Sequence, residues 1–155
     1  MKKINWLQLL VIVLITELVG VLASILSGNI GQIYTSFIKP PLSPPAWLFG
    51  VVWPVLYLLM GIAAYIIYQS RAPNRKDAIV LYWIQLFVNF LWPIIFFRFA
   101  WYWLAVVGIL MLDVLVFVAM LWFYKIKKAA GYLMLPYLLW IFFATYLNIG
   151  IAVLN

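Results

Sequence analysis

Five long apolar segments, separated by polar connections, make up most of the chain. Each has the roughly 20 mostly apolar residues that a helix needs to cross a bilayer. A helix also satisfies its own backbone hydrogen bonds there. The pattern predicts an all-α fold: an integral membrane bundle of five transmembrane helices, forming a single domain over residues 1–155. The predicted spans are Trp6–Ser27, Ala46–Tyr68, Ala78–Phe97, Phe99–Tyr124 and Ala129–Leu154.

The composition indicates that the bilayer is the main solvent of this chain. Hydrophobic residues make up 70% of it and charged residues 8%, against about half and about a quarter in a soluble domain. The chain contains neither Cys nor His. This excludes disulfides, thiol nucleophiles, imidazole bases and zinc sites built on those residues. We therefore expect no metal site and no required cofactor.

The ten Lys and Arg residues, against three Asp and Glu, give a net charge of +7. Because they lie in short clusters between apolar segments, we interpret them as topology signals and lipid contacts, and we expect no nucleic-acid binding. Five spans place the N-terminus and the second and fourth connections on one side. The positive-inside rule then predicts a multi-pass cell membrane protein with a cytoplasmic N-terminus, and with the C-terminus and first loop outside. The cations on the predicted inner side are Lys2, Lys3, Arg71, Arg75, Lys76, Lys125, Lys127 and Lys128.

Two carboxylates, Glu17 and Asp113, lie within the apolar segments. A charged side chain at the centre of an isolated membrane helix costs about 2.5–3.5 kcal/mol. Both are therefore expected to face the bundle interior or a polar cavity. They would serve either as a proton relay or ligand contact, or as hydrogen-bonded carboxyls that bridge two helices.

Three of the segments each carry aromatic and amide side chains on one helix face, at spacings of three and four residues. Amides are costly toward lipid, so these stripes are expected to face one another. They would form either interhelical packing or a pocket for a flat, mostly apolar ligand. The stripes are Trp53, Tyr57 and Gly61; Gln85, Asn89, Trp92 and Phe96; and Tyr137, Trp140, Ala144 and Asn148.

The first connection, residues 28–45, is long for a compact bundle and contains four prolines. Loops of this length are often lids or binding loops. The Pro-Pro-Leu-Ser-Pro-Pro stretch favours an extended conformation with little entropy left to lose. We interpret this connection as a lid over the open end of the bundle, with a plain linker as the alternative.

Three motifs resemble the translocator protein family, TspO/MBR, whose members are also called tryptophan-rich sensory proteins and peripheral-type benzodiazepine receptors. They are KPPLSPPAWLFGVVWPVLYLLMGIA at residues 39–63, NFLWPIIFF at residues 89–97 and LPYLLWIFFATYLN at residues 135–148. Chain length and span count agree as well. The resemblance therefore covers nearly the whole chain and suggests a bacterial member.

The resemblance implies a membrane receptor or sensor, commonly a homodimer, that binds porphyrins such as protoporphyrin IX. Isoquinoline-carboxamide and benzodiazepine compounds are further ligands of the family. The implied pocket lies under the first loop, and porphyrin is its ligand rather than a required cofactor. The implied ligand-binding residues are Tyr34, Pro44, Phe49, Trp53, Tyr57, Asn89, Trp92, Trp140 and Ala144.

Two further activities stay open at this point. Some family members promote light- and oxygen-dependent porphyrin breakdown, and the tryptophans that match this proposal, as catalytic residues, are Trp53 and Trp140. Transport of porphyrins or other small amphipathic solutes is the alternative function. Sterol binding is not expected as the native role, because the fifth segment lacks the basic residue that follows Tyr in the animal motif.

Overall fold

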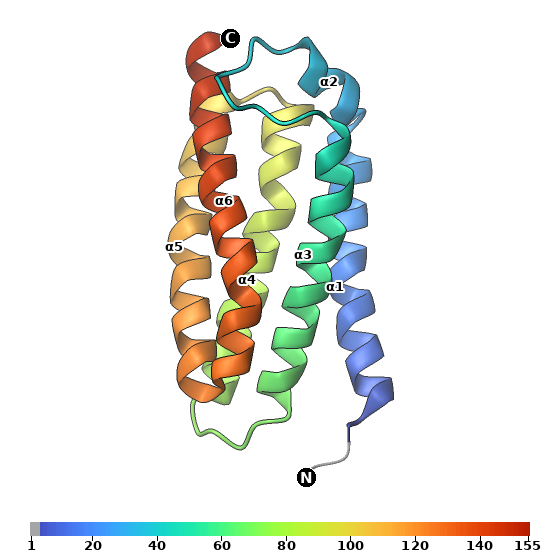
Figure 1. Cartoon of the computed structure of the whole chain (residues 1–155), viewed down its shortest axis with the longest axis vertical. Helices are drawn as coiled ribbons and strands as arrows, with labels where there is room; N and C mark the ends of the chain where they lie inside the picture. The colour runs from blue at the N-terminus through green and yellow to red at the C-terminus, as the bar shows by residue number, and fades with distance from the viewer. Residues whose placement is uncertain (1–3) are drawn as a thin grey trace.

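The computed structural model describes residues 4–155 as a bundle of long helices with a cap at one end (Figure 1). Five helical segments are long and apolar enough to cross a membrane. The all-α fold predicted from the hydrophobic pattern is therefore confirmed. The elements are α1 (Trp6–Ser27), α2 (Ile30–Ser36), α3 (Trp47–Tyr68), α4 (Arg75–Pro93) with its π-helical continuation η1 (Ile94–Arg98), α5 (Tyr102–Ile126) and α6 (Lys128–Leu154).

The helix ends differ from the predicted spans by a few residues. Arg75, Lys76 and Asp77, expected in a connection, form the first turn of α4, where the acidic side chain suits the positive end of the helix dipole. The fourth span begins at Tyr102 instead of Phe99, because the chain turns a tight corner there with Ala100 at a φ of 54°. Polar residues thus extend the helices beyond the apolar segments into the headgroup region.

The five spans form a closed ring in which each helix packs mainly on two neighbours, and α3 also contacts α4 across the ring. Going round the ring, α1 contacts α3, α3 contacts α6, α6 contacts α5, α5 contacts α4, and α4 contacts α1 again. The half of the bundle away from the cap is filled by large side chains with no exposed surface. These include Met60, Tyr82, Phe123 and Met134. Any sizeable space must therefore lie in the capped half.

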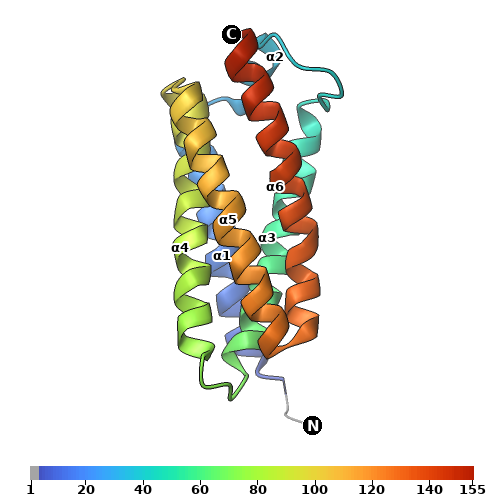
Figure 2. The same ribbon diagram turned by 90° about the vertical axis from the view of Figure 1, so that its left-hand side faces the viewer.

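The first connection is ordered and fixed to the bundle. It contains the short helix α2, which the hydrophobic pattern does not predict, followed by an extended proline-rich segment (Figure 2). Asn155 pairs with the backbone of Ile38 in both directions, at 3.0 and 2.8 Å. The Tyr146 hydroxyl donates to the Pro41 carbonyl at 2.7 Å. These bonds tie the connection to the end of α6, so it covers the bundle as a cap.

Tyr34 anchors the inner side of this cap. Its side chain is 3% exposed, and its hydroxyl donates to the Pro44 carbonyl at 2.8 Å. Burial raises the pKa of the Tyr34 phenol above its usual value, although the Ser43 side chain acts in the opposite direction. The phenol therefore stays protonated at physiological pH, and the bond to the proline-rich segment persists.

The charged ends of the bundle differ sharply. The cap and the end of α6 lie at one end, and the start of α1 lies at the other (Figure 1). The cap end carries Lys39 and Arg98. The opposite end carries the cations of the second and fourth connections and of the helix ends beside them, while Lys2 and Lys3 lie outside the described residues. The opposite-end cations are Arg71, Arg75, Lys76, Lys125, Lys127 and Lys128.

This asymmetry makes the orientation testable with single cysteines, because the chain has none of its own. Ser36→Cys in the cap and Asn74→Cys before α4 both introduce a thiol at an exposed position. We expect a membrane-impermeant maleimide to label intact cells only through Ser36→Cys, as the positive-inside rule requires. Permeabilised cells should label through both. Selective labelling of Asn74→Cys in intact cells would reverse the predicted topology.

Candidate functional site

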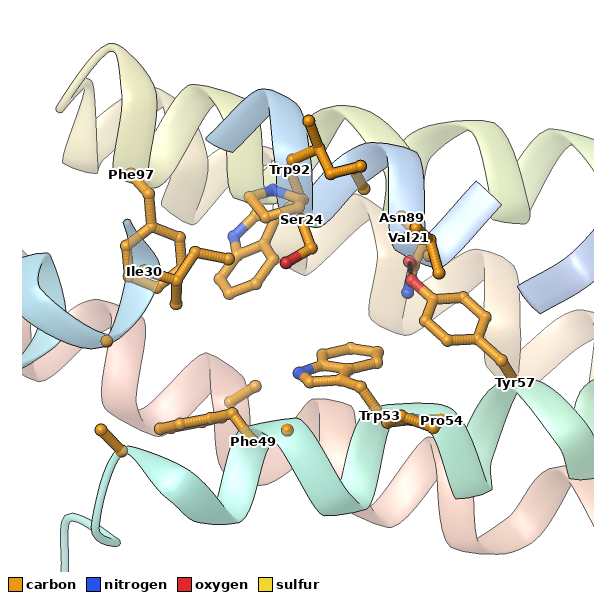
Figure 3. Close-up of a pocket in the computed structure, with 18 of the residues that line it drawn as sticks. Val21, Ser24, Ile30, Phe49, Trp53, Pro54, Tyr57, Asn89, Trp92 and Phe97 are labelled. Atoms are coloured by element: carbon orange, nitrogen blue, oxygen red, sulfur yellow. Dashed lines mark hydrogen bonds between the residues drawn. The ribbon is translucent and has the colours of Figure 1, made fainter. Parts of the chain in front are cut away.

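A cavity of about 480 Å³ lies beneath the cap, between α1, α3, α4 and α6 (Figure 3). This volume is within the range of about 300–1,000 Å³ typical of small-molecule sites. The cavity runs from α2, at Ile30 and Gly31, down to Glu17, Tyr57 and Asn89. Glu17 lies halfway along α1, so the cavity reaches toward the middle of the membrane.

Aromatic rings from three helices form its walls. Trp53 and Phe49 of α3 face Trp92 of α4 across the cavity (Figure 3). Trp140 of α6 packs edge-on against Phe49, with ring centroids 5.9 Å apart. The structure thus shows the predicted convergence of the aromatic stripes on one cavity. Flat, apolar walls of this kind suit a flat, apolar ligand.

A chain of hydrogen bonds forms the inner end of the cavity. The Tyr57 hydroxyl donates to the Asn89 amide oxygen at 2.5 Å, and the Asn89 amide nitrogen donates to the Tyr137 hydroxyl at 2.8 Å. Tyr137 in turn donates to the Gln85 amide oxygen at 2.8 Å. This series of hydrogen bonds joins α3, α4 and α6. Both interpretations of the stripes, interhelical packing and a pocket, therefore apply. The amides hold the helices together, and Asn89 also lines the cavity.

The tryptophans differ in how they are held. The Trp92 indole N–H donates to Asn148 at 2.8 Å, and its ring stacks on Phe96 at 5.6 Å. The buried indole N–H of Trp140 has no hydrogen-bond partner among residues 4–155. Packing against Phe49 and Phe143 positions that ring instead. The Trp92 ring is thus held in place by a hydrogen bond, whereas the Trp140 ring can rotate without breaking one.

Small residues let α1 approach α3 closely. The backbone of Gly20 lies against the ring of Tyr57, and Gly61 of α3 lies against Val13. At Gly20, α1 therefore makes a close helix contact within this chain. One turn further on, Ser24 lines the cavity. Val21, 52% exposed, also lines it, so the cavity reaches the outer surface of the bundle along α1.

The two carboxylates of the spans lie in different surroundings. Asp113 accepts a hydrogen bond from the Thr145 hydroxyl at 2.8 Å and so bridges α5 and α6. This is the second of the two expected roles, a hydrogen-bonded carboxyl between two helices. Glu17 lines the cavity instead. Among residues 4–155, no group of three or more carboxylates that could hold a metal ion is present.

The structure brings most of the predicted ligand-binding residues together around this cavity. Tyr34 is the first exception: it lines a separate space of about 20 Å³ beside Phe49 and Trp92. Pro44 lines neither space and instead accepts the hydrogen bond of Tyr34. Whether the others contact a ligand stays a prediction. Those that line the main cavity are Phe49, Trp53, Tyr57, Asn89, Trp92, Trp140 and Ala144.

The α1 wall and part of the α4 wall were missing from the predicted site. Glu17 and Ser24 share one face of α1, together with Gly20, at spacings of three and four residues. That spacing could have identified the wall, although of these residues the sequence predicts only for Glu17 that it faces the bundle interior or a polar cavity. Phe97 and Pro93 follow Trp92 in the second motif and also line the cavity.

Comparison with known proteins agrees with this architecture. The chain is 37% identical over 152 residues to the tryptophan-rich protein TspO of Archaeoglobus fulgidus, covering 97% of this chain and 99% of that relative. It is 38% identical to a protein of the same name from Chlorobaculum tepidum, covering 79% of this chain and 78% of the relative. It is 34% identical to the human translocator protein, covering 74% and 70%. Residues 11–154 match the sequence pattern of the TspO/MBR family. The chain is therefore a multi-pass membrane protein that belongs to the TspO/MBR family.

Proposed function

We propose that this protein is a membrane receptor or sensor that binds porphyrins, such as protoporphyrin IX, and related flat hydrophobic ligands beneath its cap. The observation that carries this proposal is the aromatic cavity of about 480 Å³. Three tryptophans, from three different helices, line it: Trp53, Trp92 and Trp140. Such a site would bind a planar apolar ring system by stacking and apolar burial.

The proposal also accounts for the way a ligand would enter. Porphyrins partition into membranes, and the cavity reaches the bundle surface through exposed residues of α1 and α3. Val21, Ile25 and Trp47 line the cavity and are 52%, 68% and 67% exposed, respectively. A ligand dissolved in the bilayer therefore has a path to the cavity without passing through the ordered cap.

Titration with protoporphyrin IX tests the proposal. We expect saturable quenching of tryptophan fluorescence in the wild-type protein. In Trp53→Leu/Trp140→Leu, the affinity should fall roughly tenfold or more, because each aromatic pair contributes about 0.5–1.5 kcal/mol beyond burial. Isothermal calorimetry would give the affinity independently of the fluorophores removed.

The matched control is Trp101→Leu/Trp103→Leu. These tryptophans are 57% and 60% exposed and do not line the cavity. This control should leave the affinity unchanged. Equal affinities for the wild type and both double variants would place porphyrin somewhere else on the protein.

Light-dependent porphyrin breakdown is a further activity that we attach to the same pair. Indole can be oxidised, and Trp53 and Trp140 both line the cavity that would hold the porphyrin. A defined product formed over several turnovers in light and oxygen, and lost in Trp53→Phe/Trp140→Phe, would support enzymatic control. Bulk bleaching matched by free tryptophan would indicate uncontrolled photochemistry.

Transport is the alternative function, and the name of the animal relatives, translocator protein, favours it. The structure would have to change for transport to occur. Below Asn89 the bundle is filled by Met60, Tyr82 and Met134, each without exposed surface. Porphyrin uptake into proteoliposomes, with and without a pH gradient, would separate a transporter from a receptor that only binds.

The homodimer and the cell-membrane location implied by the resemblance also belong to this proposal. Light scattering of the detergent-solubilised protein would give the mass of the particle. A monomer mass in every mild detergent would contradict the proposed dimer without affecting ligand binding.

A further inference from the structure

We propose that Glu17 makes the cavity selective for ligands that carry a protonated nitrogen, in an amine or in a ring, on a flat apolar body. This inference rests on the proposed function in one respect: the cavity must bind ligands at all. It adds a carboxylate contact to a cation that the aromatic walls alone would not supply. A neutral planar compound would use the walls only, whereas a cationic one would also pair with the carboxylate.

The position of Glu17 is the first argument. It lies on the face of α1 that carries Gly20 and Ser24, and all three residues line the cavity. Gly20, one turn away, lies against the ring of Tyr57. This contact places Glu17 near the inner end of the cavity, next to the aromatic wall of α3.

The lack of a partner is the second argument. Within residues 4–155, the Glu17 carboxyl makes no hydrogen bond or salt bridge, although Asp113 is bonded to Thr145. The lining of the cavity contains no Lys or Arg. A carboxylate in the membrane interior is strongly disfavoured unless it is paired. A cationic ligand would supply the missing partner, and the low-dielectric walls would strengthen that attraction.

The surrounding rings supply the third argument. Tyr57, Trp53 and Trp92 line the same cavity as Glu17. Aromatic faces attract ammonium and amidinium groups electrostatically, with tryptophan the strongest. A carboxylate among aromatic rings recognises a cation by charge and shape together. An anionic substituent would be repelled from Glu17 and would have to point toward the cap.

Two probes of matched shape test the inference: proflavine, a cation at neutral pH, and anthracene, a neutral compound with the same fused-ring outline. The full-length protein in nanodiscs of phosphatidylcholine avoids binding of the cation to anionic lipid. We expect the wild type to bind proflavine more tightly than anthracene. In Glu17→Gln, proflavine should bind about tenfold more weakly, the order expected for a charge-assisted contact, while anthracene is unaffected.

Two further variants keep the outcome interpretable. Asp113→Asn removes the other carboxylate within the spans, which does not line the cavity, and should change neither affinity. Circular dichroism would show whether Glu17→Gln disturbs folding. In that case Glu17→Leu serves as the second variant, and it should also bind proflavine about tenfold more weakly than the wild type. Unchanged proflavine binding in both Glu17 variants, with anthracene still bound, would overturn this inference alone. Absence of saturable binding of either probe, and of protoporphyrin IX, to the wild type would overturn the proposed function as well.

Discussion

Replacing Asn89 with leucine is expected to destabilise the folded bundle by about 1–3 kcal/mol, because it breaks two buried hydrogen bonds at once. Tyr57 would lose its acceptor and Tyr137 would lose its donor. Interhelical hydrogen bonds in membranes average about 0.6 kcal/mol and reach about 1.7 kcal/mol, since the unfolded chain also finds partners in the bilayer.

The measurement is reversible unfolding in mixed micelles with increasing denaturing detergent, followed by circular dichroism. Asn74→Leu is the matched control, because Asn74 is exposed and its side chain makes no capping hydrogen bond to α4. In a Tyr57→Phe background, Asn89→Leu should be less destabilising than in the wild type, since one of the two bonds is already absent. Equal unfolding curves for Asn89→Leu and Asn74→Leu would show that the network contributes nothing to stability.

The fold could be predicted because the hydrophobic pattern specifies spans directly. A helix must hide its backbone from lipid, so the length of each apolar segment determines where it crosses. The short helix α2 gave no such signal. Its seven residues, Ile30–Ser36, include three with polar side chains. Its start depends on Asn29, whose side chain accepts from the Gln32 N–H at 3.2 Å, a local bond that hydropathy does not register.

The inward direction of the aromatic stripes was predictable for a similar reason. Gln85 is fully buried and Asn89 and Asn148 are 2% and 1% exposed, as the cost of unpaired amides in lipid requires. An empty space is harder to predict than a direction. The cavity exists because Gly20, Ser24 and Ala144 leave room opposite the tryptophans. Whether neighbouring helices fill such room depends on their relative position, which the order of residues alone does not reveal.

The cavity also depends on how closely α1 approaches α3, and Gly61 controls that approach. A methyl group built on Gly61 would lie 2.9 Å from the Val13 Cα and 3.0 Å from its Cγ2. The nearest atom belongs to the backbone, so a rotamer change cannot relieve the contact and α1 must move away. One turn from Val13, a hydrogen bond between the Thr16 and Tyr82 hydroxyls, 2.8 Å long, holds α1 against α4.

Gly61→Ala is therefore expected to destabilise the protein by about 1–3 kcal/mol, the range typical of overpacking. It should also weaken porphyrin binding, because Glu17 and Ser24 would move with α1. Gly108→Ala is the matched control, since its new methyl group would meet nothing closer than Trp92 at 4.0 Å. That control should be neutral or stabilising by about 0.5–1 kcal/mol, because alanine loses less entropy in a helix. Detergent unfolding and porphyrin titration measure the two effects. If Gly61→Ala gains stability as Gly108→Ala does, α1 does not pack closely against α3 at Gly61. The residues of α1 would then not form a wall of the cavity.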